Sequence, residues 1–166
     1  MRLCDDQART LHLSHKARGL CIMYRNILVP LDVSDPQNAD AALSHAAFLA
    51  RASGAMLHLL HVRMQLPKTY ARYLPEGWDA EDTSECRDWL NSRREQVNLP
   101  QDRSTVHLRR GSVSGETLSL AVRIAADLII IGSHMPSMST RILGSNATAI
   151  VRDAQVSVLV VRCADE

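Results

Sequence analysis

The chain has 166 residues, a length typical of one domain that can bury a hydrophobic core without disulfides or structural metals. Its composition, 46% hydrophobic and 22% charged residues, is that of an ordinary globular protein. The formal net charge of +1 provides no overall attraction to nucleic acids or anionic membranes. Two basic pairs, at 93–94 and 109–110, have no interleaved aromatic residues, so we interpret them as solvated faces and expect no nucleic-acid partner.

The cysteines and histidines form no pattern typical of a disulfide framework or a metal site. The four cysteines are scattered along the chain without a CxxC pair, and the seven histidines show no HExxH spacing. We therefore expect free thiols in a reducing compartment and no metal bound by the protein alone. No apolar run approaches the roughly 20 residues that a membrane-spanning helix needs, so we expect a cytoplasmic protein without a membrane partner.

Residues 1–22 are polar and carry no sustained hydrophobic period. They end just before Met23, where the first regular pattern begins. This segment is either a poorly ordered N-terminal tail or the result of a start codon chosen upstream of Met23. In both cases we expect it to contribute little to stability, with the domain proper spanning residues 23–166.

Residues 26–62 predict a strand, a helix and a second strand. The apolar run 26–31 is typical of a buried parallel strand, and residues 56–62 have the same character. Between them, Ser34 followed three residues later by Gln37 predicts a helix start of the capping-box type, and Gly54 predicts its end.

Residues 63–81 show no clean period and predict an irregular stretch, for which a packed surface loop is favoured over a lid. Asp82 followed by Glu85 predicts the start of the next helix. A third strand is expected at 105–109, and Ser114 is the expected cap of the helix that follows it.

Residues 128–161 predict a strand at 128–131, a short helix at 146–154 and a last strand at 157–161. Strands that alternate with helices imply a parallel sheet with right-handed crossovers and helices on both faces. The expected fold class is therefore α/β, with a single open parallel sheet.

A glycine-rich connection follows the fourth predicted strand. Gly132 and Gly144 can adopt backbone angles that expose successive N–H groups, and Ser145 can cap a helix whose N-terminus attracts an anion. The spacing equally fits an ordinary strand-to-helix connection that uses glycines only for its turns. Asp32, after the first strand, could accept from a ribose hydroxyl or an adenine amine, hold Mg²⁺ beside a polyphosphate, or simply precede the Ser34 cap.

From Met23 onward the chain resembles the universal stress protein family. The resemblance rests on five segments: NILVPLDVSD at 26–35, HLLHV at 58–62, the Gly111-Ser112 turn, DLIIIGSH at 127–134, and LGSNATAIVRDAQVSVLVVR at 143–162. It implies a five-stranded parallel sheet of order 3-2-1-4-5, the adenine nucleotide alpha hydrolase-like fold, and a tendency to form dimers. The family has ATP-binding and non-binding branches.

The ATP-binding branch carries Gly, two residues, Gly, nine residues, then Gly and Ser or Thr. Gly132, Gly144 and Ser145 match this motif, but Met135 replaces the second glycine and only eight residues separate it from Gly144. The chain is nevertheless similar to the enterobacterial F/G-type subgroup, to which ATP binding is attributed. The resemblance implies ATP contacts, with Asp32 also near any Mg²⁺ on the nucleotide, at Pro30, Leu31, Asp32, Val62, Ile131, Gly132, Met135, Gly144, Ser145, Asn146 and Ala147.

Three hypotheses for function follow. The first is an ATP-binding stress-response module without rapid turnover, favoured by the intact Gly144-Ser145-Asn146 segment. The second is a nucleotide-free dimeric interaction protein of the same fold, favoured by Met135. The third is a weak ATPase or adenine-nucleotide-dependent transferase, although no nucleophile and base stand at a recognisable spacing. We also expect a homodimer through strand Ser157 to Val161, because its apolar residues lie at a predicted sheet edge.

Overall fold

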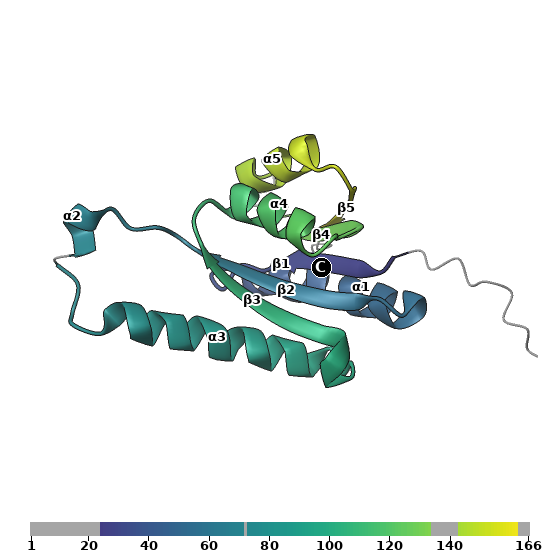
Figure 1. The fold of residues 1–166 in the computed structure, drawn as a ribbon, viewed down its shortest axis with the longest axis horizontal. Helices are drawn as coiled ribbons and strands as arrows, with labels where there is room; N and C mark the ends of the chain where they lie inside the picture. Colours follow the sequence, from purple (N-terminus) through teal and green to yellow (C-terminus); the bar gives the residue numbers. More distant parts are fainter. Residues whose placement is uncertain (1–23, 72, 134–142, 163–166) are drawn as a thin grey trace, which may run out of the picture.

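The computed structural model describes residues 24–71, 73–133 and 143–162, and its fold is a single five-stranded parallel sheet with helices on both faces (Figure 1). The strand order β3-β2-β1-β4-β5 confirms the expected topology. The expectations about residues 1–22 and Met135 fall outside the described ranges. The elements are β1 (Asn26–Pro30), α1 (Pro36–Ser53), β2 (Met56–Arg63), α2 (Lys68–Ala71), α3 (Trp78–Gln96), a 3-10 turn (Gln101–Arg103), β3 (Ser104–Arg110), α4 (Val113–Arg123), β4 (Leu128–Ser133), α5 (Ser145–Asp153) and β5 (Ser157–Arg162).

The sheet separates two apolar layers. On one face α1 and α3 cover Ile27, Val29 and Leu57, and on the other α4 and α5 cover Leu28 and Ile129 (Figure 1). Neighbouring residues of β1 enter opposite layers because side chains alternate along a strand. Both layers consist mainly of buried aliphatic side chains, which explains why β1, β4 and β5 contain continuous apolar runs.

Helix α1 lies close to the sheet because its buried face is built mainly from alanines. Ala42, Ala46 and Ala50 are fully buried at helical spacing. At the first turn of the helix, the backbone of Asn38 approaches Gly132 at the end of β4 so closely that a Cβ on Gly132 would stand 2.7 Å from the Asn38 carbonyl oxygen. This contact fixes how far α1 stands above the site.

The predicted helix starts are wrong by one to four residues. Asp35, not Ser34, caps α1 and accepts from the Asn38 amide, because Ser34 instead donates to Asp32. Ser112, not Ser114, caps α4 and accepts from the Gly115 amide. Ser34 and Asp35 can both cap α1, and Ser112 and Ser114 can both cap α4. Contacts elsewhere in the fold decide which residue of each pair does so.

Helix α3 also starts earlier than predicted, at Trp78 rather than Asp82. Gly77 precedes it with a φ of 84°, in the left-handed region that glycine tolerates. The predicted irregular stretch is therefore shorter, and it contains the short helix α2. No helix within the described ranges is long and apolar enough to cross a membrane.

Candidate functional site

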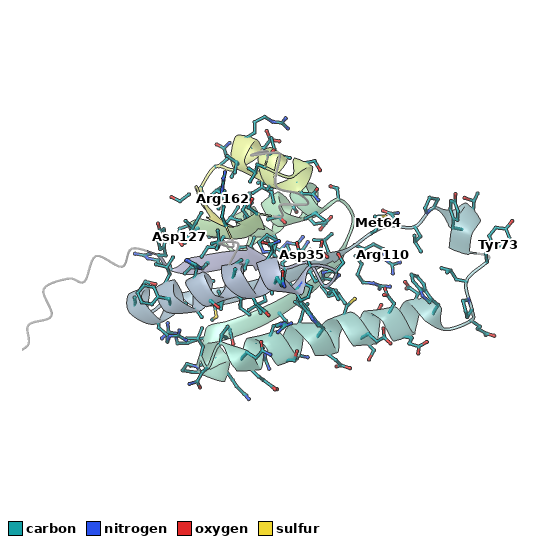
Figure 2. The ribbon with its side chains drawn as sticks, turned by 180° about the vertical axis from the view of Figure 1, so that it is seen from behind. Asp35, Met64, Tyr73, Arg110, Asp127 and Arg162 are labelled. Atoms are coloured by element: carbon teal, nitrogen blue, oxygen red, sulfur yellow. The ribbon has the colours of Figure 1, made fainter. Side chains whose placement is uncertain are left out.

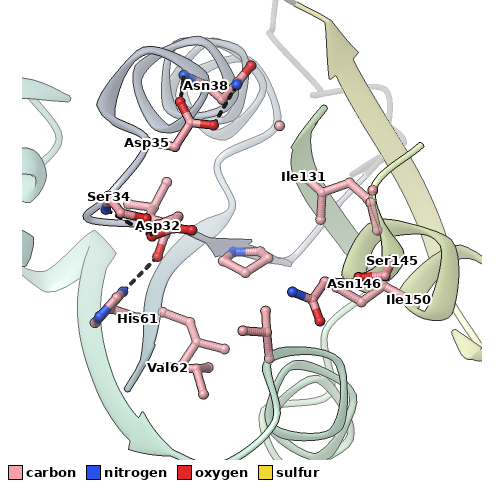
Figure 3. A pocket seen from close by; sticks show the side chains of 17 residues that line it. Asp32, Ser34, Asp35, Asn38, His61, Val62, Ile131, Ser145, Asn146 and Ile150 are labelled. Carbon is pink, nitrogen blue, oxygen red and sulfur yellow. Dashed lines mark hydrogen bonds between the residues drawn. The ribbon is translucent and has the colours of Figure 1, made fainter. Parts of the chain in front are cut away.

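A pocket of about 410 Å³ lies at the carboxyl ends of β1, β2 and β4, where the chain leaves the sheet in opposite directions (Figure 3). This volume is in the range of small-molecule sites. Three groups of residues line it: the ends of the strands, the turn into α1 with the start of that helix, and the residues of α4 and α5 that face the sheet. They are Pro30, Leu31, Asp32, Ser34, Asp35, Asn38, Leu60, His61, Val62, Val113, Ile131, Gly132, Gly144, Ser145, Asn146, Ala147 and Ile150.

The first wall of the pocket is the turn between β1 and α1. The Oδ1 atom of Asp32 accepts from the amide and the hydroxyl of Ser34, at 2.9 and 2.7 Å. This pairing holds the exposed Asp32 carboxylate in a defined orientation. Its second oxygen can accept from a ligand hydroxyl or amine.

The first turn of α1 adds a second polar group to the same wall. Asp35 accepts from the Asn38 amide at 3.4 Å and from the Asn38 side chain at 2.7 Å (Figure 3). Gly132 lies against the same turn, and a side chain there would collide with the Asn38 backbone. The sequence predicted that Gly132 adopts a special backbone angle. This prediction is wrong, because its φ lies outside the left-handed region.

The opposite wall is the N-terminus of α5. The first amides of an α-helix have no acceptor within the helix, and the N-cap residue, Gly144, has no side chain with which to satisfy them. Ser145 is the first helical residue and not the expected cap. Ser145, Asn146 and Ala147 line the pocket, and their amides lie at the positive end of the helix dipole. This arrangement suits an anion.

The third wall comes from β2. The Nδ1 atom of His61 lies 2.9 Å from the carbonyl oxygen of Leu31, and a carbonyl only accepts, so Nδ1 carries the hydrogen. In the neutral ring, Nε2 is then an acceptor. Val62 and the Leu31 side chain give this wall an apolar surface, as a flat aromatic ligand requires.

The structure brings together ten of the eleven site residues expected from the sequence, and Met135 lies outside the described ranges. Sequence reasoning missed seven lining residues. Five of the seven stood within segments that carry the family resemblance, so a signal existed for them: Ser34 and Asp35 in 26–35, Leu60 and His61 in 58–62, and Ile150 in 143–162. Asn38 and Val113 carry no such signal, because helix packing alone brings them to the pocket. The seven are Ser34, Asp35, Asn38, Leu60, His61, Val113 and Ile150.

The pocket combines donors for an anion with acceptors for hydroxyl or amine groups. The described residues contain no cluster of three or more His, Cys, Asp or Glu side chains able to hold a metal ion.

Comparison with known proteins assigns the family. The model of the universal stress protein family matches residues 23–162. The chain belongs to this family. Universal stress protein G of Escherichia coli O157:H7 is 38% identical over 146 residues, which cover 84% of this chain and 100% of that protein. Universal stress protein UspA from Lactobacillus plantarum is 28% identical and superimposes with a TM-score of 0.69, covering 84% of this chain and 98% of its own.

Two solved universal stress proteins carry nucleotides. One, in complex with cAMP, is 22% identical with a TM-score of 0.62, and the alignment covers 84% of this chain and 97% of that chain. The other, from Archaeoglobus fulgidus in complex with dAMP, is 20% identical with a TM-score of 0.60, covering 84% and 98%. At these identities the likeness shows the shared fold.

Proposed function

We propose that this universal stress protein binds an adenine nucleotide, ATP in its magnesium form, and acts in the cytoplasm as a stress-response module that senses or signals without rapid turnover. The observation that carries the proposal is the N-terminus of α5, whose first amides line the same pocket as Asp32. Related proteins of the fold hold cAMP and dAMP, which supports an adenine nucleotide as the ligand class.

Each wall of the pocket has a role in this proposal. The phosphates would lie against the amides of Ser145, Asn146 and Ala147, and the ribose would donate to Asp32. The base would lie between Val62 and the end of β1. Met135 falls outside the described ranges, and replacing a glycine in the phosphate loop there is expected to weaken binding by about 1 to 3 kcal/mol, leaving a micromolar Kd.

Binding without rapid turnover is proposed because the known contacts of both carboxylates in the pocket serve to shape the turn into α1. Asp32 accepts from the amide and the hydroxyl of Ser34, and Asp35 accepts from Asn38, so these contacts are local to that turn. The most enzyme activity that this proposal allows is slow hydrolysis of ATP, with a nucleotide-bound Mg²⁺ near Asp32.

Calorimetry with MgATP tests the proposal through one glycine. Gly144 has a φ of −55°, and among the described residues no atom lies within 4 Å of an added Cβ, so Gly144→Ala should fold and bind like the wild type. Gly144→Asp puts a carboxylate beside the phosphates and should abolish micromolar binding. Equal affinities for the two variants would contradict the proposed phosphate position.

The second candidate, a nucleotide-free interaction protein, is favoured by Met135 in place of the motif glycine. Mass spectrometry of small molecules released from freshly purified, denatured protein separates the two. No co-purified nucleotide, together with no heat of binding up to about millimolar ATP, would establish the nucleotide-free alternative.

We also propose a homodimer through β5. This strand is one edge of the sheet, and Val158, Leu159 and Val160 remain partly exposed there. An apolar edge with open backbone N–H and C=O groups is stabilised by pairing across a two-fold axis. Val160→Lys should therefore reduce the mass of the assembly measured by light scattering, and an unchanged mass would refute this contact.

A further inference from the structure

A shallow groove of about 500 Å³ runs along β3, at the edge of the sheet opposite β5. Five consecutive residues of this strand, 106–110, line the groove together with residues of α3 and α4. Because successive side chains of a strand point to opposite faces, five consecutive residues share a groove only when it follows the edge of the strand and includes the backbone. Among the described residues, none lines both this groove and the pocket at the carboxyl ends of β1, β2 and β4.

The backbone of β3 has hydrogen-bonding groups that its own sheet leaves open. Within the part of the chain that the structure describes, β3 pairs with β2 alone, in parallel register from Ser104 to Arg110. Every second N–H and C=O group of the strand therefore points away from β2. An occupant that satisfies this edge needs both donors and acceptors at strand spacing, as the backbone of an extended peptide has.

The side chains around this edge carry an excess of positive charge. The charged residues that line the groove are one glutamate and four arginines, a net charge of +3, whereas the whole chain has a formal net charge of only +1. The ring of His107 adds no charge at pH 7, since burial, followed by the charges of Arg109 and Arg123, lowers its pKa. The arginines come from α3, β3 and α4, and they are Arg87, Arg109, Arg110 and Arg123.

Positive charge lies on both faces of the strand. On one face, Arg110 lies beside the start of α3 and pairs with Asp79 (Figure 2). On the other face, the Arg109 guanidinium lies 3.3 Å from the carboxylate of Glu116 in α4. A strand added at this edge would therefore meet arginines with both of its faces.

The two helix arginines indicate a ligand rather than protection of the edge. Charged side chains on an edge strand can serve only to prevent aggregation, which would account for Arg109 and Arg110. Arg87 and Arg123 are exposed on the flanking helices, line the same groove, and have no ion pair among the described residues. Their charges remain available to an incoming carboxylate.

We propose that this groove binds an acidic, extended segment of a partner protein, which adds to β3 as a sixth strand of the sheet. Its backbone pairs with the open edge, and carboxylates on its two faces pair with the arginines of β3 and of the flanking helices. A second copy of this chain does not fit, because pairing two β3 edges brings like charges together, and residues 1–22 carry four Lys or Arg and only two Asp. Inorganic polyphosphate has no donors for the open carbonyl groups of the edge.

Fluorescence anisotropy with the full chain and a labelled peptide tests the proposal. The probe is Glu-Glu-Val-Thr-Glu-Glu, blocked at both ends, which has carboxylates on both faces when it is extended. It should bind, and the matched peptide Lys-Lys-Val-Thr-Lys-Lys should not. No binding of the acidic peptide up to about 1 mM, or equal binding of the two peptides, would overturn the proposal.

Charge reversal at the helix arginines locates the site. The double variant Arg87→Glu and Arg123→Glu should bind the acidic peptide at least about tenfold more weakly than the wild type. The matched control is the double variant Arg25→Glu and Arg152→Glu, which changes the net charge equally at exposed positions outside the groove and should keep the wild-type affinity. Urea unfolding shows whether each variant is folded, and equal affinities of the two folded double variants would contradict the proposal.

Two measurements on the unmodified chain separate strand addition from a general attraction of anions. The acidic peptide with every internal amide N-methylated keeps its charge but has no backbone donors, and it should bind about tenfold more weakly. In NMR spectra, the amide signals of 106–110 should shift when the unmethylated peptide is added. Equal affinity of the methylated peptide, unshifted signals, or displacement of the peptide by inorganic polyphosphate that binds more tightly would each overturn strand addition.

Discussion

The histidine pair between β2 and β3 predicts how stability depends on pH. The Nδ1 atom of His58 lies 3.1 Å from Nε2 of His107, and the His58 Nε2 atom lies 3.4 Å from the side-chain oxygen of Asn26. Burial, followed by the charge of His107, lowers the pKa of His58 to about 4. Burial and the charges of Arg109 and Arg123 lower the pKa of His107 as well. Both rings are therefore neutral in the folded protein at pH 7.

The sign of the effect follows from proton binding. Between pH 6.5 and about 4 the unfolded chain protonates position 58 while the folded chain does not, so the free energy of unfolding falls as the pH falls through this window. The shift corresponds to about 3 kcal/mol at most. Since pH 5 lies inside this window, only part of the difference is lost between pH 7 and pH 5, and we expect this loss to be about 1 to 2 kcal/mol.

Urea unfolding at several pH values measures this loss. His58→Gln removes one titrating ring but keeps a donor toward Asn26, and its stability should depend less on pH than that of the wild type. His45→Gln is the matched control, because His45 is exposed on α1 and its ring bonds the Ala41 carbonyl of its own helix. The reasoning is refuted if the NMR titration of His58 in the folded protein has a midpoint near 6.5, or if both variants keep the pH dependence of the wild type.

Two further predictions concern the domain. Gly132→Ala should lower the free energy of unfolding by about 1 to 3 kcal/mol, because its methyl group would meet the Asn38 backbone, whereas Gly144→Ala in open space should not; equal urea midpoints for the two would contradict this. A variant beginning at Met23 should melt within a few degrees of the full chain, and a drop of about 10 °C would show that residues 1–22 are docked on the domain.

The sequence predicted the strands and their order well because the strands depend on local patterns. Strands β1, β4 and β5 contain continuous apolar runs, and in a parallel sheet the residues that end or follow such runs meet at one edge. Asp32 and Gly132 were therefore expected to face one crevice, whereas Val62 was implied only by the family resemblance; all three line the pocket. The helix starts were less predictable. Ser34 and Asp35 can both cap a helix, and the choice depends on which residue Asp32 engages.

The sequence singled out Gly132, but the physical reason that it predicted for a glycine at this position is wrong. Sequence reasoning assigned it a special backbone angle, whereas in the fold it is required because helix α1 passes too close for any side chain. That distance follows from the alanines of α1, which are scattered over 12 residues of sequence and share one face only in the helix. Asn38 enters the pocket for the same reason.

The two edges of the sheet show where local patterns stop being informative. The apolar sequence of β5 led to the proposal that this edge pairs with a second copy, and the arginine pair at 109–110 was interpreted as a solvated face. In the structure β5 and β3 are the two edges of the sheet. The stretch predicted to be irregular, residues 63–81, is a different case, because its composition is that of an ordinary packed loop. Only the fold shows that α3 already begins at Trp78, and that Met64 and Tyr70 are exposed while Arg63 bonds to Asp82 of α3. These contacts join residues that are far apart in the sequence, so no local pattern could predict them.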